Sequence, residues 1–178
     1  MNILLSILLF LIILIGFLLF LAIVVRKQYS IQRDITINKP VNEVFEYIKD
    51  VRNQENYNVW VRKDPNVKIE YRGIDGEQGF VSSWEGNKKA GKGEQEIKKI
   101  VANTNINVEL RFEEPFKNVG QTYISTTFIA NDCTKVTWKM EGINSYPMNL
   151  INLFIDNLLG KDLNQSLINL KNILEHKI

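Results

Sequence analysis

The chain has 178 residues, which is enough for one domain and a short additional segment. Of its 22 Lys and Arg residues, two (Arg26 and Lys27) lie in the first 27 positions, which leaves 20 against 20 Asp and Glu in the rest of the chain. This balance excludes bulk electrostatic attraction to nucleic acid, so no nucleic-acid partner is expected. One His and one Cys exclude a metal site built from several such ligands, and we expect no metal or cofactor.

The first expected element is a membrane-spanning helix over residues 3–25. This run consists of Leu, Ile, Phe and Val except at Ser6, Gly16 and Ala22. As a helix it is about 34 Å long, whereas a hydrocarbon core is roughly 30 Å thick. A cleaved signal peptide is the alternative, but the run is long for one and lacks both a basic leader and a small-residue cleavage site.

Arg26 and Lys27 follow the apolar run directly, and no basic residue precedes it. Because positive residues favour the cytoplasmic side, the sequence predicts a single-pass membrane protein whose globular domain is cytoplasmic. We therefore divide the chain into an anchor with a basic flank, residues 1–27, and a domain, residues 28–178, with the bilayer as one partner.

The domain opens with an alternating segment over residues 29–37, which is typical of a strand. Asn38-Lys39-Pro40 then predicts a turn into a helix, because proline suits the first helical turn. The polar residues 50–58 suit a short second helix or a turn. The expected buried side of the first helix carries Val41, Val44, Phe45 and Ile48.

Six further segments alternate between apolar and polar residues, as strands with one solvated face do. Short turns rich in Gly, Asn and Asp separate them, and Pro115 ends one of them. The expected strands cover residues 67–72, 80–85, 93–100, 106–113, 120–130 and 134–141.

Apolar residues then recur near every 3.6 positions from Pro147 to Ile178, which predicts one long amphipathic helix. Only this helix is large enough to cover the apolar face of the sheet, so we expect an α+β fold in which a curved antiparallel sheet wraps around it. Gly160 costs about 1 kcal/mol relative to Ala in a helix interior, which predicts a close contact or a bend. We expect residues 148–159 to line the mouth of a cavity and residues 163–174 to pack against the sheet.

Over nearly all of residues 30–176 the chain resembles the helix-grip superfamily (SRPBCC), which includes START domains, polyketide cyclase/dehydrase-like proteins and coenzyme-Q-binding proteins. The order and spacing of several segments carry the resemblance. It implies a cavity between sheet and helix that holds an apolar ligand. The matching segments are residues 35–45, Asp50 followed by Trp60, and residues 91–94, 110–115, 134–142, 160–163 and 167–171.

Large apolar residues and a few polar ones share the expected inner face of the sheet and helix. In a pocket the polar residues would orient a ligand, whereas in a filled core each would need a hydrogen-bond partner. An apolar pocket and an apolar core use the same residue types, so both interpretations stay open. The candidate ligand-binding residues are Ser82, Trp84, Gln95, Phe112, Thr126, Phe128, Trp138, Phe154 and Leu158.

Catalytic candidates are few, and no catalytic residue is assigned. Glu113 and Glu114 could form an acid–base pair, but a solvated strand end is the simpler explanation. Cys133 lies in an expected hairpin turn, and His176 lies in the last turn of the final helix. Lys88, Lys89 and Lys92 form a basic loop that suits either a solvated turn or contact with anionic lipid.

The leading hypothesis is a membrane-anchored domain that binds a hydrophobic small molecule, such as a lipid, an isoprenoid or a quinone-like compound. A polyketide cyclase/dehydrase-type enzyme is one alternative, and it requires an acid–base group inside the cavity. A protein-interaction or chaperone-assisting module, which would use the outer face of the sheet or the loops, is the other.

Overall fold

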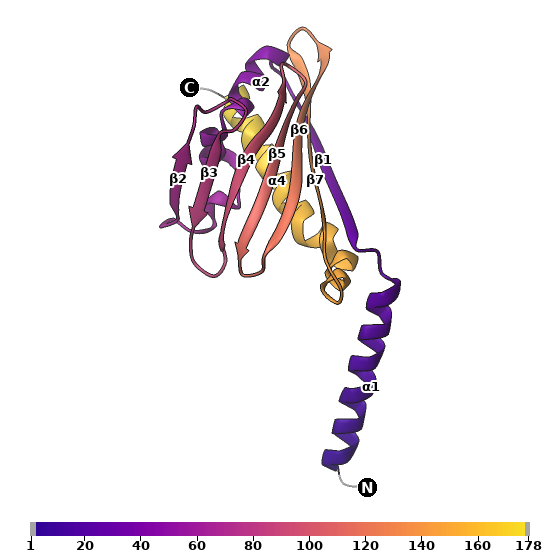
Figure 1. Cartoon of the computed structure of the whole chain (residues 1–178). Coiled ribbons are helices and arrows are strands. Elements are labelled where there is room, and N and C mark those ends of the chain that lie inside the picture. The colour runs from indigo at the N-terminus through magenta and orange to yellow at the C-terminus, as the bar shows by residue number, and fades with distance from the viewer. Residues whose placement is uncertain (1–2, 177–178) are drawn as a thin grey trace.

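The computed structural model describes residues 3–176 (Figure 1), so the expected ranges 1–27 and 28–178 each extend two residues beyond it, at 1–2 and 177–178. The predicted order of one strand, short helices, six strands and a long helix is confirmed. The elements are α1 (Ile3–Val24), β1 (Gln28–Ile37), α2 (Val41–Lys49), the 3₁₀ turn η1 (Val51–Asn53), α3 (Gln54–Tyr57), η2 (Val61–Lys63), β2 (Lys68–Arg72), β3 (Val81–Glu85), β4 (Lys92–Val101), β5 (Asn105–Glu114), β6 (Asn118–Ala130), β7 (Cys133–Ile143), η3 (Met148–Phe154) and α4 (Ile155–Glu175).

The seven strands form one antiparallel sheet in the order β1-β7-β6-β5-β4-β3-β2. Strands β2 to β7 follow one another as a meander, whereas β1 pairs with the last strand, β7. The register shifts within β4–β5, between Ile97 and Lys99, and at the end of β6–β7, between Phe128 and Ala130. Such irregularities bend strands and increase their twist, and the predicted curved sheet is confirmed.

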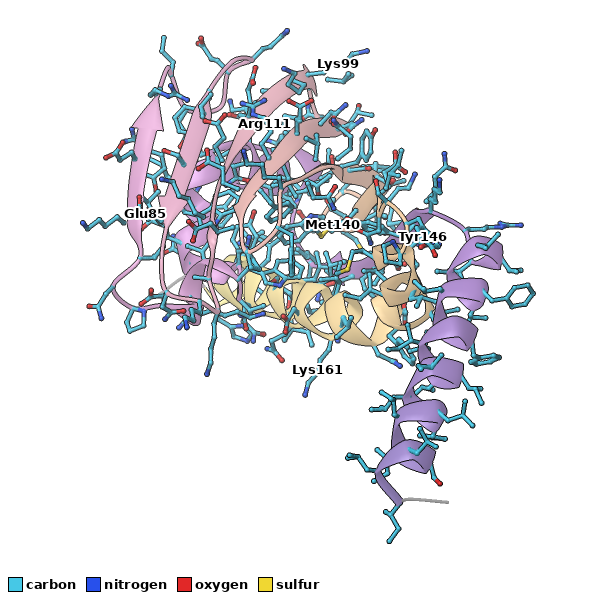
Figure 2. All side chains as sticks on the ribbon, turned by 60° about the horizontal axis from the view of Figure 1, so that its bottom comes forward. Glu85, Lys99, Arg111, Met140, Tyr146 and Lys161 are labelled. Atoms are coloured by element: carbon cyan, nitrogen blue, oxygen red, sulfur yellow. The ribbon has the colours of Figure 1, made fainter. Side chains whose placement is uncertain are left out.

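Helix α4 lies in the concave side of the sheet (Figure 1). Leu163, Leu167, Leu170 and Leu174 form its buried stripe, which confirms the predicted packing of this half against the sheet. Figure 2 shows Met140 between the sheet and α4, with Arg111 and Lys99 on the outer side. Helix α1 leaves the domain at the end where η3 and the β3–β4 and β5–β6 turns lie, which we call the α1 end; α2 and the β6–β7 turn lie at the far end (Figure 1).

The expected single helix from Pro147 is wrong in its first part, because residues Met148–Phe154 form the 3₁₀ segment η3. A 3₁₀ helix aligns side chains three positions apart. Asn149 and Asn152 have this spacing, and both donate hydrogen bonds to backbone carbonyls at and just after the end of α1. The tighter winding therefore accompanies contacts to a segment more than 120 residues away in sequence.

Gly160 is the site of a close contact, as predicted, and α4 continues through it. A Cβ atom at this position would lie 2.2 Å from Arg33 Nη2 and 3.1 Å from Ile31 Cδ1. Arg33 Nη2 also donates to both carboxylate oxygens of Asp156, at 2.8 and 2.9 Å. The glycine lets the arginine of β1 lie against the helix backbone.

The outer face of the sheet carries a network of ion pairs. Arg111 pairs with Glu94 and Glu96 at 2.8 Å each, and also with Glu109. Hydrogen bonds from Arg111 and then Lys98 hold the pKa of the Glu96 carboxyl below its usual range. This face is solvated, as the alternating strands predict.

Candidate functional site

Strand pairing aligns the inner-facing residues in rows that cross the sheet. Alternation along each strand and the pairing register together decide which side chains become neighbours. One row consists of Tyr71, Ser82, Gln95, Leu110, Gly120, Gly142 and Tyr29. The next row toward the α1 end consists of Ile69, Trp84, Gly93, Phe112 and Asn118.

Ser82 and Gln95 belong to a buried polar group. Gln95 Nε2 and Asn58 Nδ2 each donate to Gln54 Oε1 at 3.2 Å, and Asn58 Oδ1 accepts from Trp60 N at 2.9 Å. All four polar residues of the group, Gln54, Asn58, Ser82 and Gln95, are buried. Gln54 and Asn58 were not predicted as site residues, because a polar segment gives no sign in sequence that part of it is buried.

Trp138 fills the middle of the interior. Its ring meets those of Tyr57 and Trp60 nearly edge-on, with centroids 6.0 and 6.2 Å apart. Its Nε1 donates to Thr122 Oγ1 at 2.7 Å, so the one polar atom of the indole is satisfied. In this structure Trp138 is therefore a core residue.

Two hydroxyl groups inside the domain have no hydrogen-bond partner among the described residues, namely Tyr57 Oη and Thr126 Oγ1. Burial raises the pKa of the Tyr57 phenol, so the group is neutral and can donate. Buried polar atoms are normally paired, and an unpaired one costs free energy. Thr126, a predicted site residue, thus presents a free hydroxyl to the interior.

Side chains on the inner face of the sheet are fully buried in the middle of the sheet and only partly buried toward the α1 end. Ile97, Val108 and Ile124 are fully buried. By contrast Trp84 and Phe112 are only partly buried, and their rings meet edge-on with centroids 5.8 Å apart. The Trp84 ring lies over backbone, because a Cβ on the facing glycine, Gly93, would come 2.8 Å from Trp84 Cζ2. With the partly buried Leu110 and Tyr29, they form a partly open apolar patch, which we call the inner aromatic patch.

Comparison with known protein families and with curated protein sequences finds no significant match. Solved structures do match. A START-superfamily protein from Mycobacterium smegmatis has a TM-score of 0.65 at 13% identity, covering 84% of this chain and 99% of that one. Norcoclaurine synthase from Thalictrum flavum, in complex with dopamine and hydroxybenzaldehyde, has a TM-score of 0.63 at 11% identity, with 85% and 89% covered. Aha1 from Colwellia psychrerythraea has a TM-score of 0.56 at 15% identity, with 82% and 96% covered.

The chain has the helix-grip fold. The predicted resemblance is therefore confirmed for the architecture. At these identities the likeness concerns the fold alone, and one fold hosts many functions. The function of this helix-grip domain has to be inferred from its own residues.

Three of the predicted site residues lie outside the interior of the helix-grip domain: Phe128, Phe154 and Leu158 are 59%, 59% and 51% exposed. Phe128 is in register with the inner face but lies at the register shift, at the far end of the sheet. Phe154 ends the 3₁₀ segment. Leu158 lies two positions before Gly160, about 200° around the helix from the buried side. Their predicted place on the interior surface is wrong.

The catalytic candidates do not face the interior of the helix-grip domain either. Glu113 and Glu114 are exposed at the end of β5, and Glu113 pairs with Lys92 at 3.7 Å. Cys133 is a partly buried free thiol, and His176 is exposed. Within residues 3–176 no group of three or more His, Cys, Asp or Glu side chains could hold a metal ion.

Two surface hollows lie at the α1 end of the helix-grip domain. An apolar groove of about 340 Å³ separates α1 from η3, and its walls include Leu18, Leu19, Met148 and Ile151. A second hollow, of about 760 Å³, lies at the α1 ends of β1, β6 and β7. Of residues 148–159, Met148 and Ile151 line the apolar groove beside α1, whereas Leu159 packs against the core, so the expected cavity mouth stays a prediction for this range.

Proposed function

We propose that this chain is a membrane-anchored helix-grip domain that binds a hydrophobic small molecule of the lipid, isoprenoid or quinone-like class. The inner aromatic patch is the observation that supports this function most directly. Trp84 and Phe112 present apolar surface on the inner face without being closed into the core. Ligand sites of this kind are mostly apolar with a few polar groups, and here the buried polar group and the Thr126 hydroxyl lie on the same inner face.

The anchor gives such a ligand a short path from the bilayer to the inner aromatic patch. Helix α1 is long and apolar enough to cross a bilayer, and its large apolar side chains are exposed. Arg26 and Lys27 follow it, which favours a cytoplasmic domain. The α1 end, with the inner aromatic patch, then lies beside the bilayer, where poorly soluble molecules are concentrated.

Burial of apolar surface supplies enough affinity without any chemistry. A ligand that removes about 400 Å² of apolar surface from water, counting its own area and that of the protein, gains about 10 kcal/mol before the cost of association. The amides of Gln54 and Gln95 could orient one polar group of the ligand.

The test is recovery of bound small molecules from the full chain purified in detergent, followed by mass spectrometry and by titration in defined lipid mixtures. Phe112→Ala should weaken binding about tenfold or more, which corresponds to about 1.4 kcal/mol. Phe128→Ala removes an exposed ring at the far end and is the matched control, with binding unchanged. Protein that stays empty in every mixture, or equal binding by both variants, would contradict the proposal.

A further inference from the structure

The α1 end of the domain carries exposed apolar residues that belong to loops and not to the inner face. They are Phe116 in the β5–β6 turn and Tyr146, Met148, Ile151, Leu153 and Phe154 in and around η3, all between 40% and 68% exposed. We call this set the rim. We propose that the rim lies in the headgroup region of the bilayer, so that the domain has one fixed orientation on the membrane. The inference rests on α1 being the anchor proposed above.

Asn149 and Asn152 attach the rim to the anchor. Asn149 Nδ2 donates to the carbonyl oxygens of Ala22 and Val25 at 2.7 Å each. Asn152 Nδ2 donates to those of Arg26 and Lys27 at 2.9 Å each. Carbonyls at the end of a helix lack intrahelical partners, so Asn149 caps the C-terminus of α1, and Asn152 binds the connection that follows it. Asn149 is fully buried in the contact.

The connection between anchor and domain has little slack. Only Val25, Arg26 and Lys27 separate α1 from β1. Asn144 N donates to Lys27 O at 2.9 Å, and Asn144 Nδ2 donates to Asn152 Oδ1 at 2.7 Å. The loop after β7, η3 and the connection are therefore tied together, and η3 is held level with the C-terminal end of α1.

This position brings the rim to the depth of the bilayer surface. If α1 spans the membrane, its C-terminal end lies at the interface, and η3 lies there with it. Figure 2 shows Tyr146 beside that end of α1. Aromatic and aliphatic side chains are favourable at this depth, and η3 has no charged residue. The basic turn at Lys88 and Lys89 lies at the same end and suits anionic headgroups (Figure 1).

Depth-dependent fluorescence quenching tests the proposal on the full chain. Cys133 is the only cysteine, so Cys133→Ser gives a background for single cysteines labelled with an environment-sensitive dye. The probes are Leu153→Cys and Phe116→Cys in the rim, Ile74→Cys in an exposed turn at the far end, and Leu9→Cys inside α1. Vesicles of phosphatidylcholine and phosphatidylglycerol carry spin-labelled lipids as quenchers.

We expect rim dyes to be quenched at least threefold more than the dye at Ile74. If the dye at Leu9 is quenched but the rim dyes are quenched no more than the dye at Ile74, the rim contact alone is overturned. If the dye at Leu9 is not quenched, the proposed anchor is overturned. Asn149→Ala and Asn152→Ala should each lower rim quenching and leave Leu9 unchanged, while Asn157→Ala, exposed on α4, should change neither. Unchanged rim quenching in both asparagine variants, with folding verified by near-ultraviolet circular dichroism, would refute the fixed orientation.

Discussion

Replacing Gly160 by alanine measures how firmly Arg33 occupies the space beside α4. In a helix interior this change gains about 1 kcal/mol. Here the new Cβ would lie 2.2 Å from Arg33 Nη2, so the guanidinium must move and its ion pair with Asp156 is lost. The two side chains are 31% and 69% exposed, and such a pair contributes about 0.2 to 1 kcal/mol. Gain and loss nearly cancel, and we expect Gly160→Ala to lie within about 1 kcal/mol of the wild type.

With a side chain larger than alanine at position 160, the gain in helix propensity no longer offsets the loss. Gly160→Leu also pushes against Ile31, whose Cδ1 would lie 3.1 Å from the new Cβ, and overpacking of this kind costs about 1 to 3 kcal/mol. Asn169→Leu should cost less. It removes the hydrogen bond from Asn169 Nδ2 to Tyr57 O at 3.1 Å, worth about 1 kcal/mol, and the exposed bond from Gln165 Nε2 to Asn169 Oδ1 at 3.0 Å, worth about 0.2 to 0.5 kcal/mol. Asn164→Leu, at an exposed position of the same helix, controls for leucine on α4.

A double-mutant cycle isolates the contact between Arg33 and the glycine. With Arg33→Ala in place, Gly160→Ala should recover its full helical gain, so the two changes should couple by about 0.5 to 1 kcal/mol. The measurement is urea unfolding of the full chain in detergent micelles, followed by tryptophan fluorescence. Effects that add within about 0.3 kcal/mol, or equal small effects of Gly160→Leu and Asn169→Leu, would refute this account of the glycine.

Three further predictions address the interior, a turn and the outer face. Tyr57→Phe should leave the free energy of unfolding unchanged or raise it, because the buried hydroxyl has no partner among the described residues; a loss above about 1 kcal/mol in urea unfolding would show that it is paired. Gly91→Ala should lower the melting temperature by about 4 °C or more, because φ is +68° and a Cβ would lie 2.5 Å from Glu114 O; a shift below about 1 °C would contradict the strain. The lowered pKa of Glu96 stabilises the fold above the usual value of 4.5, and this contribution is lost as the pH falls through the lowered value. Glu96→Gln should therefore have a flatter melting-temperature profile than the wild type between about pH 5 and 3, and parallel profiles would count against the ion pairs.

Sequence alternation was sufficient to place Ser82, Trp84 and Gln95 on one face, because the period of a strand fixes the face and short turns fix the neighbours. It did not find Gln54 and Asn58. Their segment is held under the sheet by α4, where Ser166 Oγ accepts from Val59 N at 3.1 Å, and no local pattern encodes that contact.

Two exposed residues show the opposite error, because the sequence predicted them to lie in the interior. Phe154 and Leu158 have the composition and spacing of core residues, and a periodic pattern cannot tell a protein interior from another apolar environment. The sequence did not predict the 3₁₀ winding of η3, for a related reason. Its local sequence suits an α-helix, and the contacts that accompany the tighter winding come from the other end of the chain.

The pairing of β1 with β7 also sets an order of events during synthesis. Helix α1 and strand β1 leave the ribosome first, yet Gln28 pairs with Ile143, and Asn149 follows its partner Ala22 by 127 positions. At 5 to 20 residues per second, this interval is about 6 to 25 s. During that time α1 can enter a bilayer while β1 is an unpaired edge. Closure of the sheet, attachment of η3 and packing of α4 then come last. A chain cut after β7 would keep its apolar helix, but it would lose both the contacts of η3 to the end of α1 and the helix that buries the inner face of the sheet.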